Sequence, residues 1–170
     1  MTLDQAGFLL SVFLPAVNSE YAKTLRVIQA VPPAKCSYRP HPDSRSALEL
    51  VWHIASCDIW FLDGFLQKRF EMEDDTMPAD FKDSEEILGW YAETFPPKLD
   101  EVKKLPAEFW ATPLPFFGIY NHPAVMYLQF MLFHTIHHRG QLAAYLRSMG
   151  AKVPNIYGGS FDEPMTPPEA

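Results

Sequence analysis

Three histidines lie close together in the last third of the chain, at His134, His137 and His138. Residues four apart on an α-helix lie one turn above each other on the same face, so we pair His134 with His138 and expect His137 to point elsewhere. Two imidazoles in this arrangement form a bidentate clamp for a divalent transition metal such as zinc, nickel or iron. The spacing therefore predicts two ligands of a metal site.

A third ligand has to come from another helix. His53 is the natural candidate, because it lies on the apolar stripe of a predicted helix, where an unpaired imidazole would be costly to bury. We therefore predict that His53, His134 and His138 bind one metal ion. A competing interpretation, that these histidines simply bond to carbonyl groups, applies readily to an HxxxH pair alone and loses weight once a third helix-borne histidine is added.

Other metal chemistries lack their residues in this sequence. A di-iron bundle needs two Glu-x-x-His motifs, and none occurs. A zinc protease of the HExxH type has Glu directly after its first histidine, whereas Thr135 follows His134 here. The site therefore lacks that built-in general base, and no catalytic residue is assigned. Three neutral ligands predict an open, electrophilic site that accepts water or a thiol, and a coordinated thiol would lose its proton.

Four further side chains fall on the ligand-bearing faces and are candidates for a pocket or for contacts to the ligands. Cys57, one turn after His53, is a fourth ligand or a small buried core residue. Gln141 holds a metal-bound water or forms a bond within the bundle. Trp60 and Tyr127 line a pocket or pack in the core.

The elements that must position these residues are helices, because apolar residues recur at helical spacing between proline-rich loops. A first helix is predicted over residues 4–30, where Pro15 should kink or restart it. A second helix begins after Ser46, whose pairing with Glu49 is typical of a capping box, and runs to about Arg69. This second helix carries the third predicted ligand.

A third helix is predicted to open at Asp83, with Glu86 as its capping partner. We expect the Pro96-Pro97 pair to interrupt it, and the helix to resume through Leu105. No window shows sustained alternation of apolar and polar residues, so strands are not expected beyond a short piece within residues 114–120. The chain between the second and the last helix is thus predicted to be mainly helical.

The last helix carries the histidine pair. Pro123 is a favoured first helical residue, and Gly150 after Met149 is a typical end signal. Together the windows predict an all-α fold, a four-helix bundle that occupies residues 1–170 as a single domain. The proline-rich tail, from about residue 154 to residue 170, is expected to wrap the bundle or to stay mobile.

The composition limits the partners of the chain. Hydrophobic residues make up 48% and charged residues 21% of the sequence, which is sufficient for a folded core. The formal charge of −7 repels phosphate backbones and anionic lipids, so neither nucleic acid nor a membrane surface is an expected partner. The two cysteines form no CxxC pair, and we see neither a secretory signal nor a membrane helix. We expect a cytoplasmic protein.

The run His134-Thr-Ile-His-His138-Arg-Gly-Gln-Leu142, with His53 in an upstream helix and the ending Val153-Pro-Asn-Ile-Tyr157-Gly158, resembles the DinB/YfiT-like family. This family is distinct from the DNA polymerase that shares its name. The resemblance covers most of the chain, from the segment Tyr38-Arg-Pro-His-Pro42 to the tail. It implies a four-helix bundle, usually a homodimer, in which a histidine of the second helix and the HxxxH pair hold the metal.

The resemblance also implies a class of activity. Characterised relatives include transferases and isomerases that use a low-molecular-weight thiol cofactor, and the family name refers to induction by DNA damage without implying DNA binding. We therefore expect a metal-dependent S-transferase that acts on a small electrophilic substrate. Two alternatives stay open, namely a metal-dependent hydrolase of the same fold and a non-catalytic metal-binding module of the stress response.

Overall fold

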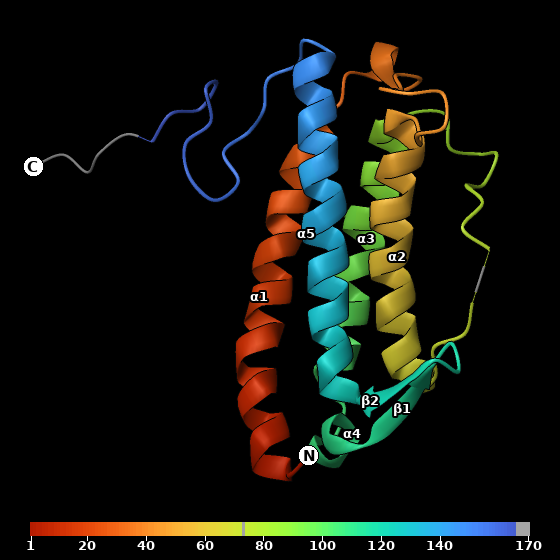
Figure 1. Cartoon of the computed structure of the whole chain (residues 1–170), viewed down its shortest axis with the longest axis vertical. Helices are drawn as coiled ribbons and strands as arrows, with labels where there is room; N and C mark the ends of the chain where they lie inside the picture. Colours follow the sequence, from red (N-terminus) through yellow and green to blue (C-terminus); the bar gives the residue numbers. More distant parts are fainter. Residues whose placement is uncertain (73, 166–170) are drawn as a thin grey trace, which may run out of the picture.

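The computed structural model describes residues 1–72 and 74–165. The regular elements of the part described are four long α-helices, one short α-helix, one 3-10 helix and a two-stranded hairpin (Figure 1). In chain order the elements are α1 (Leu3–Gln29), η1 (Pro33–Lys35), α2 (Ala47–Gln67), α3 (Ser84–Val102), α4 (Ala107–Ala111), β1 (Pro113–Phe116), β2 (Tyr120–Pro123) and α5 (Ala124–Ser148). The four long helices lie side by side, which confirms the predicted all-α four-helix bundle.

The connection between α2 and α3 runs back along the outside of the bundle. In Figure 1, α1 and α5 point in one direction and α2 and α3 in the other, so α2 and α3 are parallel and need a long return segment. Two indole N–H groups of α2 bind carbonyls of this segment: Trp60 donates to Glu71 at 3.1 Å, and Trp52 donates to Asp75 at 3.0 Å. The return segment is therefore fastened to the helix that carries His53.

Side-chain caps fix where α2 and α3 begin. The capping box at α2 is confirmed, because Ser46 accepts a bond from the Glu49 N–H and the Glu49 carboxylate accepts one from the Ser46 N–H. At α3, Asp83 accepts from the N–H of Glu86, but the Glu86 carboxylate binds the N–H of Lys82 instead of completing a box. Each such cap contributes about 1 kcal/mol to helix stability.

Prolines inside two helices do not end them. The expected interruption at Pro96-Pro97 is wrong, because α3 continues past both residues. Pro96 has no N–H for the carbonyl of Ala92, and this carbonyl instead accepts a bond from the Tyr21 hydroxyl at 3.4 Å. Helix α1 likewise continues through Pro15 and does not restart there. Packing between the helices offsets the roughly 3 kcal/mol that an interior proline costs.

The hairpin β1–β2 closes the end of the bundle at which α5 begins (Figure 1). Leu114 pairs with His122 across the two antiparallel strands. The expected strand within residues 114–120 is found in part as β1, whereas the second strand was not predicted. Phe117 and Gly118 adopt positive φ angles of 55° and 69° at the turn, and the Phe117 N–H donates to the carbonyl of Phe70 at 3.1 Å. The hairpin is thereby joined to the segment that follows α2.

The tail is held to the bundle by ion pairs as far as it is described. Arg26 of α1 pairs with Glu163 at 2.5 Å, and Arg147 of α5 pairs with Asp162 at 2.5 Å. Residues 166–170, which belong to the tail as predicted, lie outside the described residues. Within the described ranges, no helix combines the length and the apolar character that crossing a bilayer requires.

A buried ion pair connects α1, α5 and the tail. Arg139 is 1% exposed and forms an ion pair with the carboxylate of Glu20, while the Tyr157 hydroxyl donates to the same carboxylate. Arg139 also donates to the Glu20 carbonyl at 3.0 Å and to the Thr24 hydroxyl at 3.2 Å. Removing one partner of such a pair would leave an uncompensated charge in the interior.

Candidate metal centre

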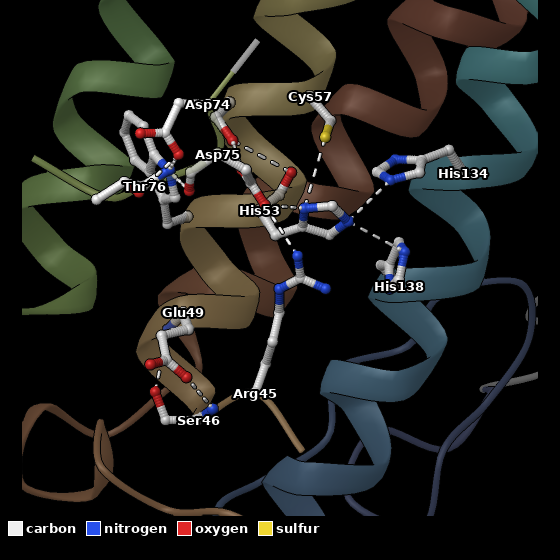
Figure 2. A network of polar contacts seen from close by, with 12 residues as sticks. Arg45, Ser46, Glu49, His53, Cys57, Asp74, Asp75, Thr76, His134 and His138 are labelled. Carbon is white, nitrogen blue, oxygen red and sulfur yellow. Dashed lines mark hydrogen bonds and ion pairs between the residues drawn. The ribbon is translucent and has the colours of Figure 1, made fainter. Parts of the chain in front are cut away.

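The three predicted ligands lie together between α2 and α5 (Figure 2). His53 lies on α2, and His134 and His138 lie one turn apart on α5. The Nε2 atom of His53 is 3.0 Å from Nε2 of His134 and 3.3 Å from Nε2 of His138. Each of the two α5 rings therefore presents a nitrogen to the same nitrogen of the α2 ring.

A cysteine lies beside the histidines. The ligand atoms of His53, Cys57 and His134 all lie within 4.8 Å of one another, so this group could hold a metal ion. His138 is outside that group, although its Nε2 is close to Nε2 of His53. Cys57 approaches the other nitrogen of the His53 ring, with its Sγ 3.6 Å from Nδ1. Cys57 and His138 thus contact different edges of His53. Two ligand sets are therefore possible: His53 and His134 with Cys57, or His53 and His134 with His138.

The environment of Cys57 favours the neutral thiol. Burial, followed by the negative charges of Asp75 and Asp58, raises the pKa of Cys57 to about 12. A thiolate is the form that binds metals and attacks electrophiles. Without a metal nearby, Cys57 therefore stays protonated at neutral pH, and metal binding by its sulfur would require loss of that proton.

Asp75 determines which nitrogen of His53 carries the proton. Its Oδ2 lies 2.6 Å from Nδ1 of His53 and also accepts a bond from Arg45 at 2.9 Å. Its Oδ1 accepts a bond from the Ser56 hydroxyl at 3.0 Å. A carboxylate only accepts hydrogen bonds, so Nδ1 of His53 is protonated and its Nε2 carries the lone pair. Carboxylate–histidine pairs of this kind orient metal-binding imidazoles.

Gln141 likewise determines which nitrogen of His138 carries the proton. Its Oε1 is 3.1 Å from Nδ1 of His138, and its Nε2 donates to the Tyr145 hydroxyl at 3.2 Å. The Tyr145 hydroxyl donates in turn to the carbonyl of Arg45 at 3.4 Å, which fixes the direction of the chain of bonds. Nδ1 of His138 is therefore the protonated nitrogen, and Nε2 of His138 carries the lone pair.

The donor atoms present fit a bound cation. The lone pairs of His53 and His138 face each other at 3.3 Å, an arrangement that is repulsive without a positive charge between them. His134 adds a third ring, and its Nδ1 is buried without a hydrogen-bond partner among the described residues. Neutral imidazole nitrogens are common ligands of zinc, nickel and iron.

All three imidazoles are held in the form that binds metals. Burial, and then the neighbouring histidines, lowers the pKa of His134 to about 3. Burial also lowers the pKa of His53 and of His138 below the ordinary value. A neutral imidazole has the free lone pair that coordination requires. Protons therefore compete weakly with a metal for these nitrogens at neutral pH.

The other residues named from the sequence lie in different places. Trp60 and Cys57 line a cavity next to His134, and Gln141 contacts His138 as described. Tyr127 is fully buried, accepts a bond from the His122 N–H at 2.9 Å and donates to the carbonyl of Leu114 at 2.7 Å, so its hydroxyl holds the hairpin to α5.

His137 is exposed and lies outside the ligand group. Its ring centroid is 4.7 Å from that of His138, with the ring planes near perpendicular at 76°. Its place on the outer side of α5 agrees with the prediction from helical spacing.

Sequence reasoning missed Asp75, Arg45 and Tyr145. Asp75 lies in the return segment between α2 and α3, which has no helical periodicity to place it. Arg45 precedes α2, and Tyr145 lies on α5 seven residues after His138, two turns beyond it. The helical spacing of Tyr145 from Gln141 was the one signal that could have indicated it.

The chain is thus an all-α bundle in which the second and the last long helix together supply a histidine-rich candidate metal site. The chain belongs to the DinB family, which it matches over residues 7–169. This confirms the family that the histidine-rich run indicated. None of the curated proteins compared with the chain matches it.

Two solved structures share the fold. A DinB-like protein from Bacillus cereus is 23% identical, with a TM-score of 0.71, and the match covers 85% of this chain and 95% of that one. The DinB-like protein YjoA from Bacillus subtilis is 22% identical, with a TM-score of 0.67, and the match covers 85% of this chain and 96% of that one. At these identities the likeness concerns the fold alone.

Proposed function

We propose that this protein is a metal-dependent S-transferase that joins a low-molecular-weight thiol to a small electrophile. In this proposal His53, His134 and His138 hold one divalent transition metal through their Nε2 atoms. The observation that carries it is the contact of His53 Nε2 with both α5 histidines beside a cavity that His134 lines.

The distances support the three-histidine set. Ligands about 2.1 Å from a metal, at angles between a right angle and the tetrahedral angle, lie about 3.0–3.4 Å from one another. The two Nε2 separations at His53, 3.0 and 3.3 Å, fall in this range. The nitrogen that Cys57 approaches, Nδ1 of His53, is already bound to Asp75. Cys57 is therefore assigned to the cavity wall and not to the metal.

The ligand set also supports thiol transfer over hydrolysis. When bound, a divalent metal held by neutral ligands supplies the positive charge that lowers the pKa of a thiol reaching it. A hydrolase would need a carboxylate free to take a proton from water. The carboxylate next to the ligands, Asp75, is fully engaged by His53, Arg45 and Ser56. It is placed to orient His53 and not to serve as a base.

The reaction is a simple exchange of bonds. The thiol loses its proton to solvent, its sulfur forms a bond to the electrophilic carbon, and the displaced group leaves with its electron pair. The cavity next to His134 excludes part of the solvent around that carbon. Its lining includes Trp52, Trp60, Phe116 and Phe117, so the electrophile meets mainly apolar side chains.

A conjugation assay tests the proposal. Protein loaded with zinc, nickel or iron, one metal at a time, is mixed with monochlorobimane and either cysteine, glutathione or coenzyme A, and the fluorescent adduct is measured. We expect conjugation that depends on the metal, disappears in His53→Ala and persists in His137→Ala. A cobalt-substituted protein should also show a sulfur-to-metal charge-transfer band with the active thiol. Metal-loaded protein that neither conjugates nor changes its cobalt spectrum with any of these thiols would refute thiol transfer.

A further inference from the structure

The cavity beside the metal centre has the size of a ligand site. Its volume is about 520 Å³, and Cys57 and His134 lie in its wall. Pockets that bind small molecules commonly enclose about 300–1,000 Å³. Because His134 also contacts His53, a molecule in this cavity lies next to the candidate metal site.

Aromatic rings form much of the wall. Trp52 and Trp90 lie with their ring centroids 5.2 Å apart, and Trp60 and Phe117 lie 5.4 Å apart. The indole N–H groups of Trp52 and Trp60 are already used by backbone carbonyls of the return segment. These two rings therefore offer ring surface and not a hydrogen-bond donor, which suits a flat apolar or aromatic group.

The charged side chains of the wall are acidic. Lining the cavity are Asp63, Asp74 and Asp75, and no lysine or arginine of residues 1–72 and 74–165 is among the lining residues. Asp63 is paired with Lys98, and Asp75 is paired with Arg45. These two charges are therefore compensated from outside the cavity.

Asp74 differs from its two neighbours in the wall. Its carboxylate accepts bonds from the N–H and the hydroxyl of Thr76, at 3.0 and 2.6 Å, and forms no ion pair within the described part of the chain. These bonds lower the pKa of Asp74, so the group stays charged. Asp74 therefore contributes a negative charge that no described residue of the wall neutralises. It lies in the return segment next to Asp75 and Thr76 (Figure 2).

We propose that this cavity binds a cationic aromatic compound, with its ring against the tryptophans and its positive charge near Asp74. A cation is attracted both by the faces of indole rings and by an unpaired carboxylate, whereas an anion is repelled by the same groups. The inference rests on the proposed function in one respect: for an S-transferase, the compound with the electrophilic carbon would be a cationic aromatic compound of this kind. The binding preference itself can be measured without any reaction.

The test compares three soluble benzyl compounds of different charge. Benzyltrimethylammonium, benzyl methyl sulfone and phenylmethanesulfonate are added to the full-length protein freed of metal by a chelator, and binding is measured by equilibrium dialysis at low ionic strength. Metal-free protein is used because a divalent metal held by neutral histidines next to the cavity would itself attract the anion and repel the cation. We expect the cation to bind roughly tenfold more tightly than the anion, with the neutral sulfone between them.

Two substitutions assign this preference to the wall. Asp74→Asn keeps the acceptor for Thr76 and removes the charge, so the cation-to-anion ratio should fall to about threefold. The matched control is Asp80→Asn, an exposed residue of the same segment that does not line the cavity, and it should leave the ratio unchanged. Trp90→Leu keeps an apolar wall and should weaken binding of the cation more than binding of the sulfone.

The outcomes separate this inference from the proposed function. Equal binding of cation and anion, tighter binding of the anion, or no binding of any of the three compounds overturns the inference, even if metal-dependent conjugation is observed. An unchanged ratio in Asp74→Asn overturns the role of that residue. A cation preference in a protein that conjugates no thiol supports the inference while the S-transferase proposal fails.

Discussion

Nδ1 of His53 lies 2.6 Å from Oδ2 of Asp75, although Asp75 follows His53 by 22 residues and lies outside any helix (Figure 2). The contact forms because the return segment between α2 and α3 passes back along α2, where the Trp52 indole holds the Asp75 carbonyl. The carboxylate fixes the proton on Nδ1 and leaves Nε2 of His53 free to bind a metal. The ligand geometry thus depends on a loop as well as on two helices.

Asp75→Asn should weaken metal binding without removing the ligands. The amide keeps an oxygen acceptor but loses the charge that orients His53 and attracts Arg45. Replacing such an outer partner typically lowers metal affinity about 10- to 100-fold. Competition with a chromophoric zinc chelator measures the change, and Asp80→Asn serves as the control. Equal zinc affinity in Asp75→Asn and the parent protein would argue against a role for this contact.

Gln141 should act on His138 in the same way. Gln141→Leu removes the acceptor for Nδ1 of His138 while keeping a side chain of similar size, so zinc affinity should fall by about tenfold or more. Gln141→Glu restores an acceptor and should recover most of the loss. If both variants bind zinc as the parent does, the bond to His138 has no influence on the metal.

The contrast between the histidines and Asp75 shows what helical periodicity can predict. His53, His134 and His138 were identified because helices repeat at a known spacing, and the Ser46–Glu49 cap located the start of α2. Asp75 has no such repeat around it, and only the path of the return segment brings it to His53.

Contacts from distant residues also explain the errors at the prolines and the hairpin. Local rules predict a break at Pro96, but a hydroxyl from α1, that of Tyr21, binds the carbonyl that the proline leaves free. The second strand of the hairpin, β2, shows no alternation of its own and is defined by its pairing with β1. These features depend on residues far away in the sequence, which local patterns do not report.

The Glu20–Arg139 pair should make the fold sensitive to acid. Burial alone would raise the pKa of Glu20, but the bonds from Tyr157, Lys23 and Arg139 outweigh it, so the pKa of Glu20 lies below its ordinary value. The ionised form is therefore favoured by folding. The contribution of the Glu20 carboxylate to the free energy of unfolding is fully present above the unfolded-state pKa of about 4.3. It is lost as the pH falls through the lower pKa of the folded state.

Glu20→Gln tests this dependence. The variant leaves Arg139 buried without a charged partner, so we expect it to lower the free energy of unfolding by about 3 kcal/mol at neutral pH. Urea unfolding at several pH values should show that the difference in the free energy of unfolding between the parent and the variant becomes smaller below about pH 4.3. Arg26→Gln, which removes an exposed pair with Glu163, is the control and should cost less than about 1 kcal/mol. If the difference in the free energy of unfolding between the parent and Glu20→Gln does not change with pH, ionised Glu20 is not the group that makes the fold sensitive to acid.

The central claim, that three histidines and not Cys57 hold the metal, is tested most directly by metal content. Purified parent protein and single variants are loaded with zinc, passed through a desalting column and analysed for zinc per chain. We predict that His138→Ala loses the metal, whereas Cys57→Ser and His137→Ala keep the parent stoichiometry. Full zinc content in His138→Ala together with its loss in Cys57→Ser would contradict the account and assign the metal to His53, Cys57 and His134.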